Sequence, residues 1–434
     1  MPDMSVEPYR DITFDKDGDV DARQRDRLAE LDVTDLVMFA HGWNNSPSIA
    51  AQLYSAFFAP FPGLLAASPG VRLGYAGVVW PSMKFTDEPV PDFSPSVFGP
   101  PTEPGLDKAT QDALVELFPG HRATVERLAR LLDEQPESEA AFAEFGVLAR
   151  QLAEVPAGGL ESGFTDDLPQ AEQGPPAVLY EDALTMCRKF TLALEETGAV
   201  TEKPAVQSFS LGGGLKKAWK GAKELLRQTT YYAMKRRAGT VGELGLGPLL
   251  GQLARSSPEV RIHLVGHSQG ARLVSFALRG LPDGVQNVKS LTLLQGAFSH
   301  YAFAPSLPHS THSGGALRSM EHRVDGPVVA CYSRHDIALG VIYPLASSLA
   351  GDDASAVGLD KRWWAMGHDG IQAVGQTSRL TLEQALRDGI PGSGCVSVDT
   401  ASVVRRGGPP AGAHSDICHE ELARVVVAAG RIGR

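Results

Sequence analysis

Apolar and polar positions along the chain follow two alternating patterns. Short apolar runs bounded by Gly, Pro and polar residues are typical of buried strands. Most of these runs are separated by stretches in which apolar residues recur every three or four positions, which is typical of helices. The alternation predicts an α/β fold with a mostly parallel sheet and helices on both faces. Strands are expected at residues 35–40, 71–80, 260–265, 288–295, 327–333 and 394–399, and core helices at 48–58, 271–278 and 420–429.

This regularity fails in one long stretch between the second and third expected strands. A proline-rich segment at 89–104 is followed by residues with helical periodicity. Because a loop of this length without structure is uncommon in a compact domain, we expect a helical cap inserted into the core. The cap is predicted to comprise residues 83–227, and the core residues 1–82 and 228–434. Cap helices are expected at 108–118, 121–134, 139–155 and 180–196.

Composition narrows the range of partners and compartments. The 434 residues carry a formal net charge of -11, which disfavours a general nucleic-acid binder. The first ten residues lack the basic start and apolar core of a secretory signal, and no apolar run reaches the ~18 residues of a membrane span. The 4 cysteines are scattered without the spacing of a disulfide framework or a zinc site. We therefore expect a cytoplasmic protein.

The pentapeptide Gly266-His267-Ser268-Gln269-Gly270 lies between the expected strand at 260–265 and the expected helix at 271–278. A Gly-x-Ser-x-Gly pattern in this strand–turn–helix context is typical of a nucleophile elbow, in which small residues permit a tight backbone and the serine hydroxyl stands at a helix N-terminus. The pattern alone is weak evidence, and its flanks give it weight. Ser268 is therefore the predicted nucleophile.

A serine nucleophile needs a base and an acid. In the α/β-hydrolase fold, where such elbows are typical, both follow the serine along the chain, first the acid and then the histidine. Asp336, just after the strand at 327–333, is the predicted acid, although an aspartate there could also simply cap a turn. His414 follows the last strand and a Gly/Pro-rich stretch, and it is the predicted base. His368 remains an alternative because it also follows Asp336, and His419, which can also be an ordinary first-turn residue of the final helix, is another. His267 is not expected to be the base, since a residue adjacent to the serine points away from the hydroxyl.

The oxyanion of an acyl-transfer reaction needs hydrogen-bond donors. The backbone N–H groups of Gln269, next to the serine, and of Trp43, in the turn after the first expected strand, are the predicted donors. The same turn can be interpreted as a plain strand-to-helix connection, with Ser46 as cap and Pro47 at the first helical position. The two interpretations are compatible.

Four motifs of the chain occur together. They are His41-Gly-Trp-Asn-Asn45, Val79-Trp-Pro-Ser82, the pentapeptide around Ser268, and Ser333-Arg-His-Asp-Ile-Ala-Leu339. In this combination the chain resembles a group of bacterial α/β-hydrolases over about residues 30–82 and 228–434. The resemblance implies the hydrolase fold and a serine nucleophile, and it assigns the catalytic roles to Ser268, Asp336 and His414. It implies no particular substrate, and the long insertion after Ser82 departs from it.

These features together predict a serine hydrolase that acts on a small-molecule carboxylic ester. Neither a metal nor an organic cofactor is expected. An acyltransferase or thioesterase with the same triad is one alternative, and a non-catalytic scaffold that retains a hydrolase core is another.

A basic amphipathic segment spans residues 215–237. Apolar residues recur on one of its faces, and lysines such as Lys216 and Lys220 occupy the other. Such a helix can lie on an anionic membrane as a lid, or it can be a cap helix whose lysines are solvated. We expect the second arrangement, without membrane association.

Overall fold

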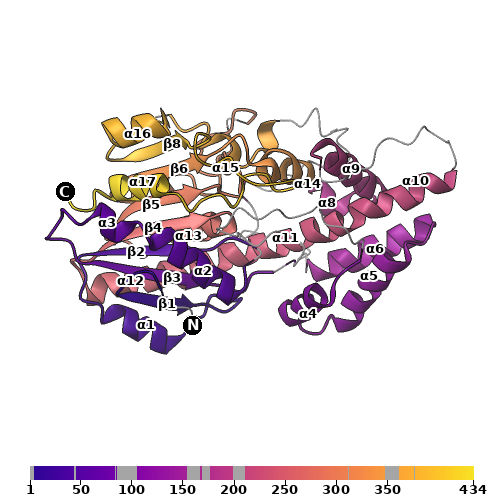
Figure 1. The fold of residues 1–434 in the computed structure, drawn as a ribbon, viewed down its shortest axis with the longest axis horizontal. Helices are drawn as coiled ribbons and strands as arrows, with labels where there is room; N and C mark the ends of the chain where they lie inside the picture. Colours follow the sequence, from indigo (N-terminus) through magenta and orange to yellow (C-terminus); the bar gives the residue numbers. More distant parts are fainter. Residues whose placement is uncertain are drawn as a thin grey trace.

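The computed structural model describes residues 4–43, 45–83, 85, 105–153, 167–168, 176–198, 211–310, 312–347, 361–375 and 377–434. Its centre is one eight-stranded sheet in which every pairing is parallel, with the strand order β1-β3-β2-β4-β5-β6-β8-β7 (Figure 1). The α/β fold class is therefore confirmed. The strands are β1 (Tyr9–Thr13), β2 (Asp35–Ala40), β3 (Leu73–Val79), β4 (Arg261–His267), β5 (Val288–Leu294), β6 (Pro327–Tyr332), β7 (Ser378–Thr381) and β8 (Gly394–Asp399).

Both faces of the sheet are covered because alternate residues of each strand point to opposite sides. In β2, Val37 and Phe39 pack in one core cluster, whereas Leu36 and Met38 pack in another. The first face is covered by α2 (Pro47–Phe58), α3 (Phe61–Leu64), α16 (Leu382–Asp388) and α17 (Glu420–Gly430). The second is covered by α1 (Ala22–Ala29), α11 (Ala222–Thr240), η3 (Val241–Leu246), α12 (Gly247–Ser256) and α13 (Gln269–Gly280).

The expected strands all form, and two edge strands were not predicted. Strands β2 and β8 have the expected bounds, and the other four differ from expectation by one to two residues at their ends. Strands β1 and β7 lie at the two edges of the sheet. Ile12 is the one fully buried residue of β1, and β7 has none, so neither strand carries the apolar run by which a buried strand is recognised.

A group of helices, here called the outer helices, lies at the end of the molecule away from the sheet (Figure 1). Helix α11 extends from this group to α13, which packs on the sheet. It passes without a break through residues 227 and 228, so the expected boundary between cap and core falls inside one helix. The outer helices are α4 (Lys108–Leu117), α5 (Arg122–Glu134), α6 (Glu139–Leu152), α8 (Ala177–Tyr180), α9 (Ala183–Glu196) and α10 (Leu211–Ala218).

The basic segment 215–237 forms the end of α10, a short 3-10 turn and most of α11. Its apolar face is buried inside the protein: the Trp219 ring stacks on Phe142 with centroids 4.2 Å apart. On the other face, Lys217 forms an ion pair with Glu195 at 2.9 Å. One lysine of this segment therefore pairs with an acidic residue of the outer helix α9.

Membrane-spanning character and the proline-rich segment are two further features considered from the sequence. Across the described ranges, none of the helices combines the length and the apolar character that crossing a membrane requires. The proline-rich segment 89–104 and the expected end of the cap helix at 154–155 lie outside the described residues. The short helices α14 (Tyr343–Ser347) and α15 (Met366–Asp369) follow β6.

Candidate active site

Ser268 lies at a sharp turn between β4 and α13. Its backbone has φ 56° and ψ -120°, a conformation that a residue with a Cβ adopts only under constraint. The close packing of the turn requires the motif glycine, because a Cβ on Gly270 would overlap the carbonyl oxygen of Ala40 at the end of β2. The serine side chain is thus held beyond the carboxyl end of β4, at the N-terminus of α13.

The structure brings the three predicted residues Ser268, His414 and Asp336, here called the candidate triad, into one hydrogen-bonded row. Ser268 Oγ lies 2.8 Å from His414 Nε2, and His414 Nδ1 lies 2.7 Å from Asp336 Oδ2. A carboxylate only accepts hydrogen bonds, so Nδ1 carries the imidazole proton and Nε2 accepts from the serine hydroxyl. This is the tautomer in which the histidine can remove a proton from the serine.

Asp336 is fixed just beyond the end of β6. Its side chain is fully buried, and its Oδ1 accepts a hydrogen bond from the Leu339 N–H at 3.0 Å. Its backbone forms an isolated bridge with Gly412, two residues before His414. Asp336 and the loop that carries His414 are therefore joined through their main chains as well as their side chains.

The two alternative histidines lie in other environments. The His368 ring packs edge-on against Trp364 with centroids 4.7 Å apart, in the short helix α15. His419 precedes α17, and its Nε2 lies 2.9 Å from Asp416 Oδ1. Of the three candidate bases, His414 is the one that contacts Ser268.

The turn after β2 packs directly on Ser268. A Cβ on Gly42 would lie 2.7 Å from the Ser268 Cβ, so only glycine permits this approach. The Gly42 carbonyl accepts from the Asn45 side chain at 3.2 Å and lies 2.8 Å from His41 Nδ1. Because N–H and C=O of a trans peptide point in opposite directions, the Trp43 N–H points away from these partners. Within the described ranges, neither this N–H nor that of Gln269 donates to a protein acceptor.

Residues outside the predicted set hold this turn in place. The Trp80 ring stacks on His41 with centroids 5.6 Å apart, and its Nε1 donates to the His41 carbonyl at 2.9 Å. The Tyr54 hydroxyl accepts from the His41 N–H at 3.1 Å. Burial lowers the pKa of His41 to about 4, so its ring is neutral near pH 7. His41 and Trp80 belong to the sequence motifs at 41–45 and 79–82. Their contact could not be predicted from those motifs, because it depends on the pairing of β2 with β3.

Helix α11 covers the Ser268 turn with aromatic side chains. The Tyr231 hydroxyl donates to the Ala297 carbonyl at 2.6 Å, and the Ala297 N–H donates to the Ser268 carbonyl at 3.1 Å. The Tyr231 ring also packs edge-on against Trp43, with centroids 5.5 Å apart. Ser268 itself is 5% exposed.

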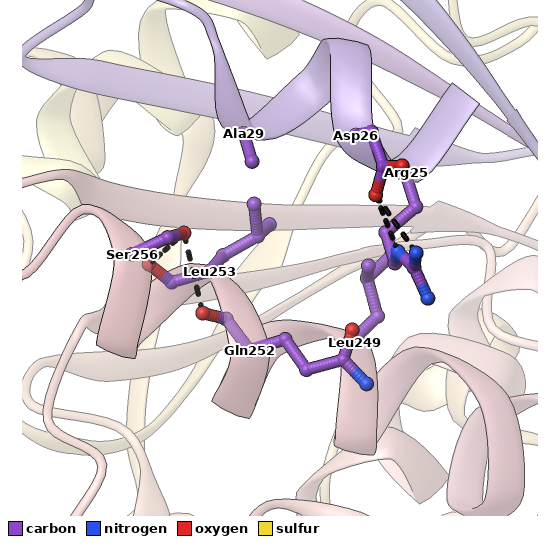
Figure 2. Close-up of a pocket in the computed structure, with 7 residues that line it drawn as sticks. All are labelled: Arg25, Asp26, Ala29, Leu249, Gln252, Leu253 and Ser256. Atoms are coloured by element: carbon purple, nitrogen blue, oxygen red, sulfur yellow. Dashed lines mark hydrogen bonds and ion pairs between the residues drawn. The ribbon is translucent and has the colours of Figure 1, made fainter. Parts of the chain in front are cut away.

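A surface pocket of about 180 Å³ lies elsewhere, between α1 and α12 (Figure 2). Its lining includes Ala29 and Ser256, at the C-terminal ends of these helices. Both helices lead into parallel strands, so the pocket lies near the amino ends of the strands, whereas the candidate triad lies beyond their carboxyl ends. The pocket contains none of the predicted site residues, and we assign it no role in chemistry.

Fold and site together define an α/β protein with a Ser-His-Asp arrangement at the carboxyl ends of its strands. In the part of the chain that the structure describes, His, Cys, Asp and Glu side chains form no group of three or more suited to a metal ion. No family model, curated protein or solved structure matches the chain.

Proposed function

We propose that this protein is a serine hydrolase of the α/β-hydrolase fold that cleaves small-molecule carboxylic esters. One observation carries the proposal: Ser268, on a strained turn at a helix N-terminus, lies 2.8 Å from a histidine whose other nitrogen lies 2.7 Å from a buried carboxylate. This combination of strain, hydrogen bonding and position is the constellation that acyl transfer by serine requires.

The proposed reaction proceeds in two halves. In the first, His414 Nε2 takes the Ser268 hydroxyl proton as Oγ bonds to the acyl carbon, and the imidazolium then gives this proton to the leaving alkoxide as the ester C–O bond breaks. In the second, His414 takes a proton from water, the hydroxide attacks the acyl-enzyme, and the proton returns to Oγ as the carboxylic acid leaves. Asp336 holds the imidazole orientation and stabilises its cationic form.

Negative charge that develops on the acyl oxygen needs donors near Ser268. The N–H groups of Trp43 and Gln269 are the proposed pair, because they flank the serine and have no acceptor among the described residues. Donors already fixed in place stabilise a developing charge without reorganisation during the reaction.

The position of each proposed catalytic residue along the sheet also supports the hydrolase fold. The serine follows β4, the acid follows β6 and the base follows β8, in the chain order serine, acid, histidine. Strands β4, β5, β6 and β8 are consecutive neighbours in one parallel sheet, so their carboxyl ends lie along the same edge.

Covalent labelling tests the proposal directly. A fluorophosphonate probe should label the wild-type protein and not Ser268→Ala, while far-ultraviolet circular dichroism of the two proteins stays the same. p-Nitrophenyl esters of graded length, assayed beside a thioester and with an added alcohol, would separate ester hydrolysis from thioesterase and acyltransferase activity. Equal labelling of the wild type and the variant would overturn the proposed function.

A further inference from the structure

The backbone around His414 is tied to the neighbours of both its triad partners. On the acid side, the Ala413 N–H donates to the carbonyl of His335, which precedes Asp336, at 2.9 Å. On the serine side, Nε2 of His267, which precedes Ser268, lies 2.9 Å from the His414 carbonyl oxygen. The first contact uses only main-chain atoms, whereas the second depends on a side chain.

The His267 contact fixes the protonation of that ring. A carbonyl oxygen only accepts, so the proton is on Nε2 and His267 donates. The side chain is 4% exposed. Burial first, and the nearby charge of His414 next, lower the pKa of His267 to about 3, so the ring remains a neutral donor at ordinary pH.

The main chain just before His414 is held mainly from the acid side: the Ala338 N–H donates to the Ala411 carbonyl at 3.2 Å, and Asp336 bridges to Gly412. His414 lies in no helix or strand, and it follows the segment Gly407-Gly-Pro-Pro-Ala-Gly412. His267, in contrast, is the last residue of β4, a fully paired central strand. The hydrogen bond from His267 to the His414 carbonyl therefore fixes the position of the loop relative to β4, the strand that leads into Ser268.

We propose that His267 is a positioning residue, which sets the distance between Ser268 Oγ and His414 Nε2 by holding the main chain of His414. The inference deepens the proposed function and rests on it. Near-attack geometry is sensitive to small displacements, and a shift of about 1 Å can cost about 100-fold in rate. His267 does not exchange protons with the substrate in this scheme.

Two substitutions separate the hydrogen bond from the volume of the side chain. His267→Phe keeps a planar ring and removes the donor, whereas His267→Gln restores an N–H near the position of Nε2. We expect His267→Phe to lower kcat by about 10- to 100-fold with KM nearly unchanged, and His267→Gln to recover most of the loss. His267→Leu, compared by thermal unfolding, replaces the Phe variant if that variant fails to fold.

The pH profile distinguishes positioning from chemistry. For a positioning residue, the acid limb of kcat/KM persists in both variants because it belongs to another group. Loss of that limb, with His267→Gln as inactive as His267→Phe, would make His267 a proton carrier and overturn the inference. Wild-type kcat in a folded His267→Phe variant would overturn it as well.

A readout without turnover keeps the inference separate from the proposed function. The proton between His414 Nδ1 and Asp336 should give a far-downfield proton resonance in wild type, absent from Asp336→Asn. We expect the signal to broaden or vanish in His267→Phe and to persist in His267→Gln. If the wild type shows no labelling by fluorophosphonate, the proposed function fails, yet a sharp signal in His267→Phe would still refute the positioning role on its own.

Discussion

A second Ser-His-Asp arrangement lies in β2, β4 and β5, nearer the amino ends of the strands than the candidate triad. In this inner set, Ser290 Oγ lies 3.0 Å from His263 Nδ1, and His263 Nε2 lies 3.0 Å from Asp35 Oδ1. The corresponding distances in the candidate triad are 2.8 and 2.7 Å. In both sets a carboxylate accepts from one ring nitrogen, which leaves the other to accept from a serine hydroxyl. Hydrogen bonding alone therefore does not separate them.

Backbone and exposure do separate the two sets. Ser290 lies inside strand β5, and its partner His263 is directly opposite in β4. Ser290 and His263 are 0% exposed, whereas Ser268 is 5% exposed and the His414 side chain is 16% exposed. A hydroxyl inside a sheet has no room for an acyl carbon and no free N–H groups beside it. The turn at Ser268 has N–H groups beside it that donate to no acceptor among the described residues, which is what makes its hydroxyl a candidate nucleophile.

Charge also differs between the two ends of the strands. Arg261 Nη1 lies 3.0 Å from Asp35 Oδ1 and adds a permanent cation to the inner set. Burial raises the pKa of Asp35, but hydrogen bonds from His263 and Thr34 and the charge of Arg261 outweigh it and leave the pKa lowered. The inner set is thus a structural network that joins β2, β4 and β5.

The two serines give the sharpest test of this contrast. Ser268→Ala should lower kcat by on the order of 10⁴ or more, because it removes the proposed nucleophile. Ser290→Ala should keep turnover within about tenfold and lower the free energy of unfolding by about 1 kcal/mol, because it removes one buried hydrogen bond. Ester turnover and urea unfolding measure the two effects. Loss of turnover in a folded Ser290→Ala variant would contradict the structural role given to the inner set.

The histidines should divide in the same way. His414→Ala should lower kcat by about 10⁴-fold in a folded protein, since only a residue that reaches Ser268 can take its proton. His263→Ala should instead cost about 2–3 kcal/mol of stability, because the buried Asp35 loses a donor. His368→Ala and His419→Ala serve as controls and should remain within about tenfold of wild type. If His368→Ala is the inactive variant, the assignment of the base is wrong.

Most strands of the sheet and the chain order of the candidate triad could be predicted from the sequence. The central strands were predictable because burial on both faces makes them continuous apolar runs, as in β2. The edge strand β7 was not predictable, because its Ser-Arg-Leu-Thr residues form no such run. His414 was predictable from its place after the last strand, without knowledge of any contact.

The inner set and the contact of His267 were beyond sequence reasoning. His263 and Ser290 meet because the register between β4 and β5 shifts after Ile262: Ile262 is opposite Val288, and His263 is opposite Ser290. His267 reaches the His414 carbonyl only after the loop beyond β8 folds back on the turn. Sequence spacing carries no information about either event.

A further expected effect concerns stability in acid, where two buried histidines near the candidate triad titrate differently from Asp35 at the other end of the sheet. Burial lowers the pKa of His41 to about 4 and of His267 to about 3, against about 6.5 in an unfolded chain. At pH values between the folded-state and unfolded-state pKa, the unfolded chain binds more protons than the folded protein. The contribution of these histidines to the free energy of unfolding is therefore complete above about pH 6.5 and falls as pH decreases. Asp35, whose pKa is lowered, loses its contribution only below about pH 4.

Each of these two histidines should therefore contribute a slope of about 1.4 kcal/mol per pH unit between about pH 6 and pH 4.5. His267→Gln removes one titrating group while it keeps the donor to His414, so the variant should show a shallower loss of stability over this interval. Urea unfolding of both proteins at three pH values across the interval measures the difference. Equal slopes in the two proteins would mean that His267 is already protonated in the folded state, which is incompatible with its role as a buried neutral donor.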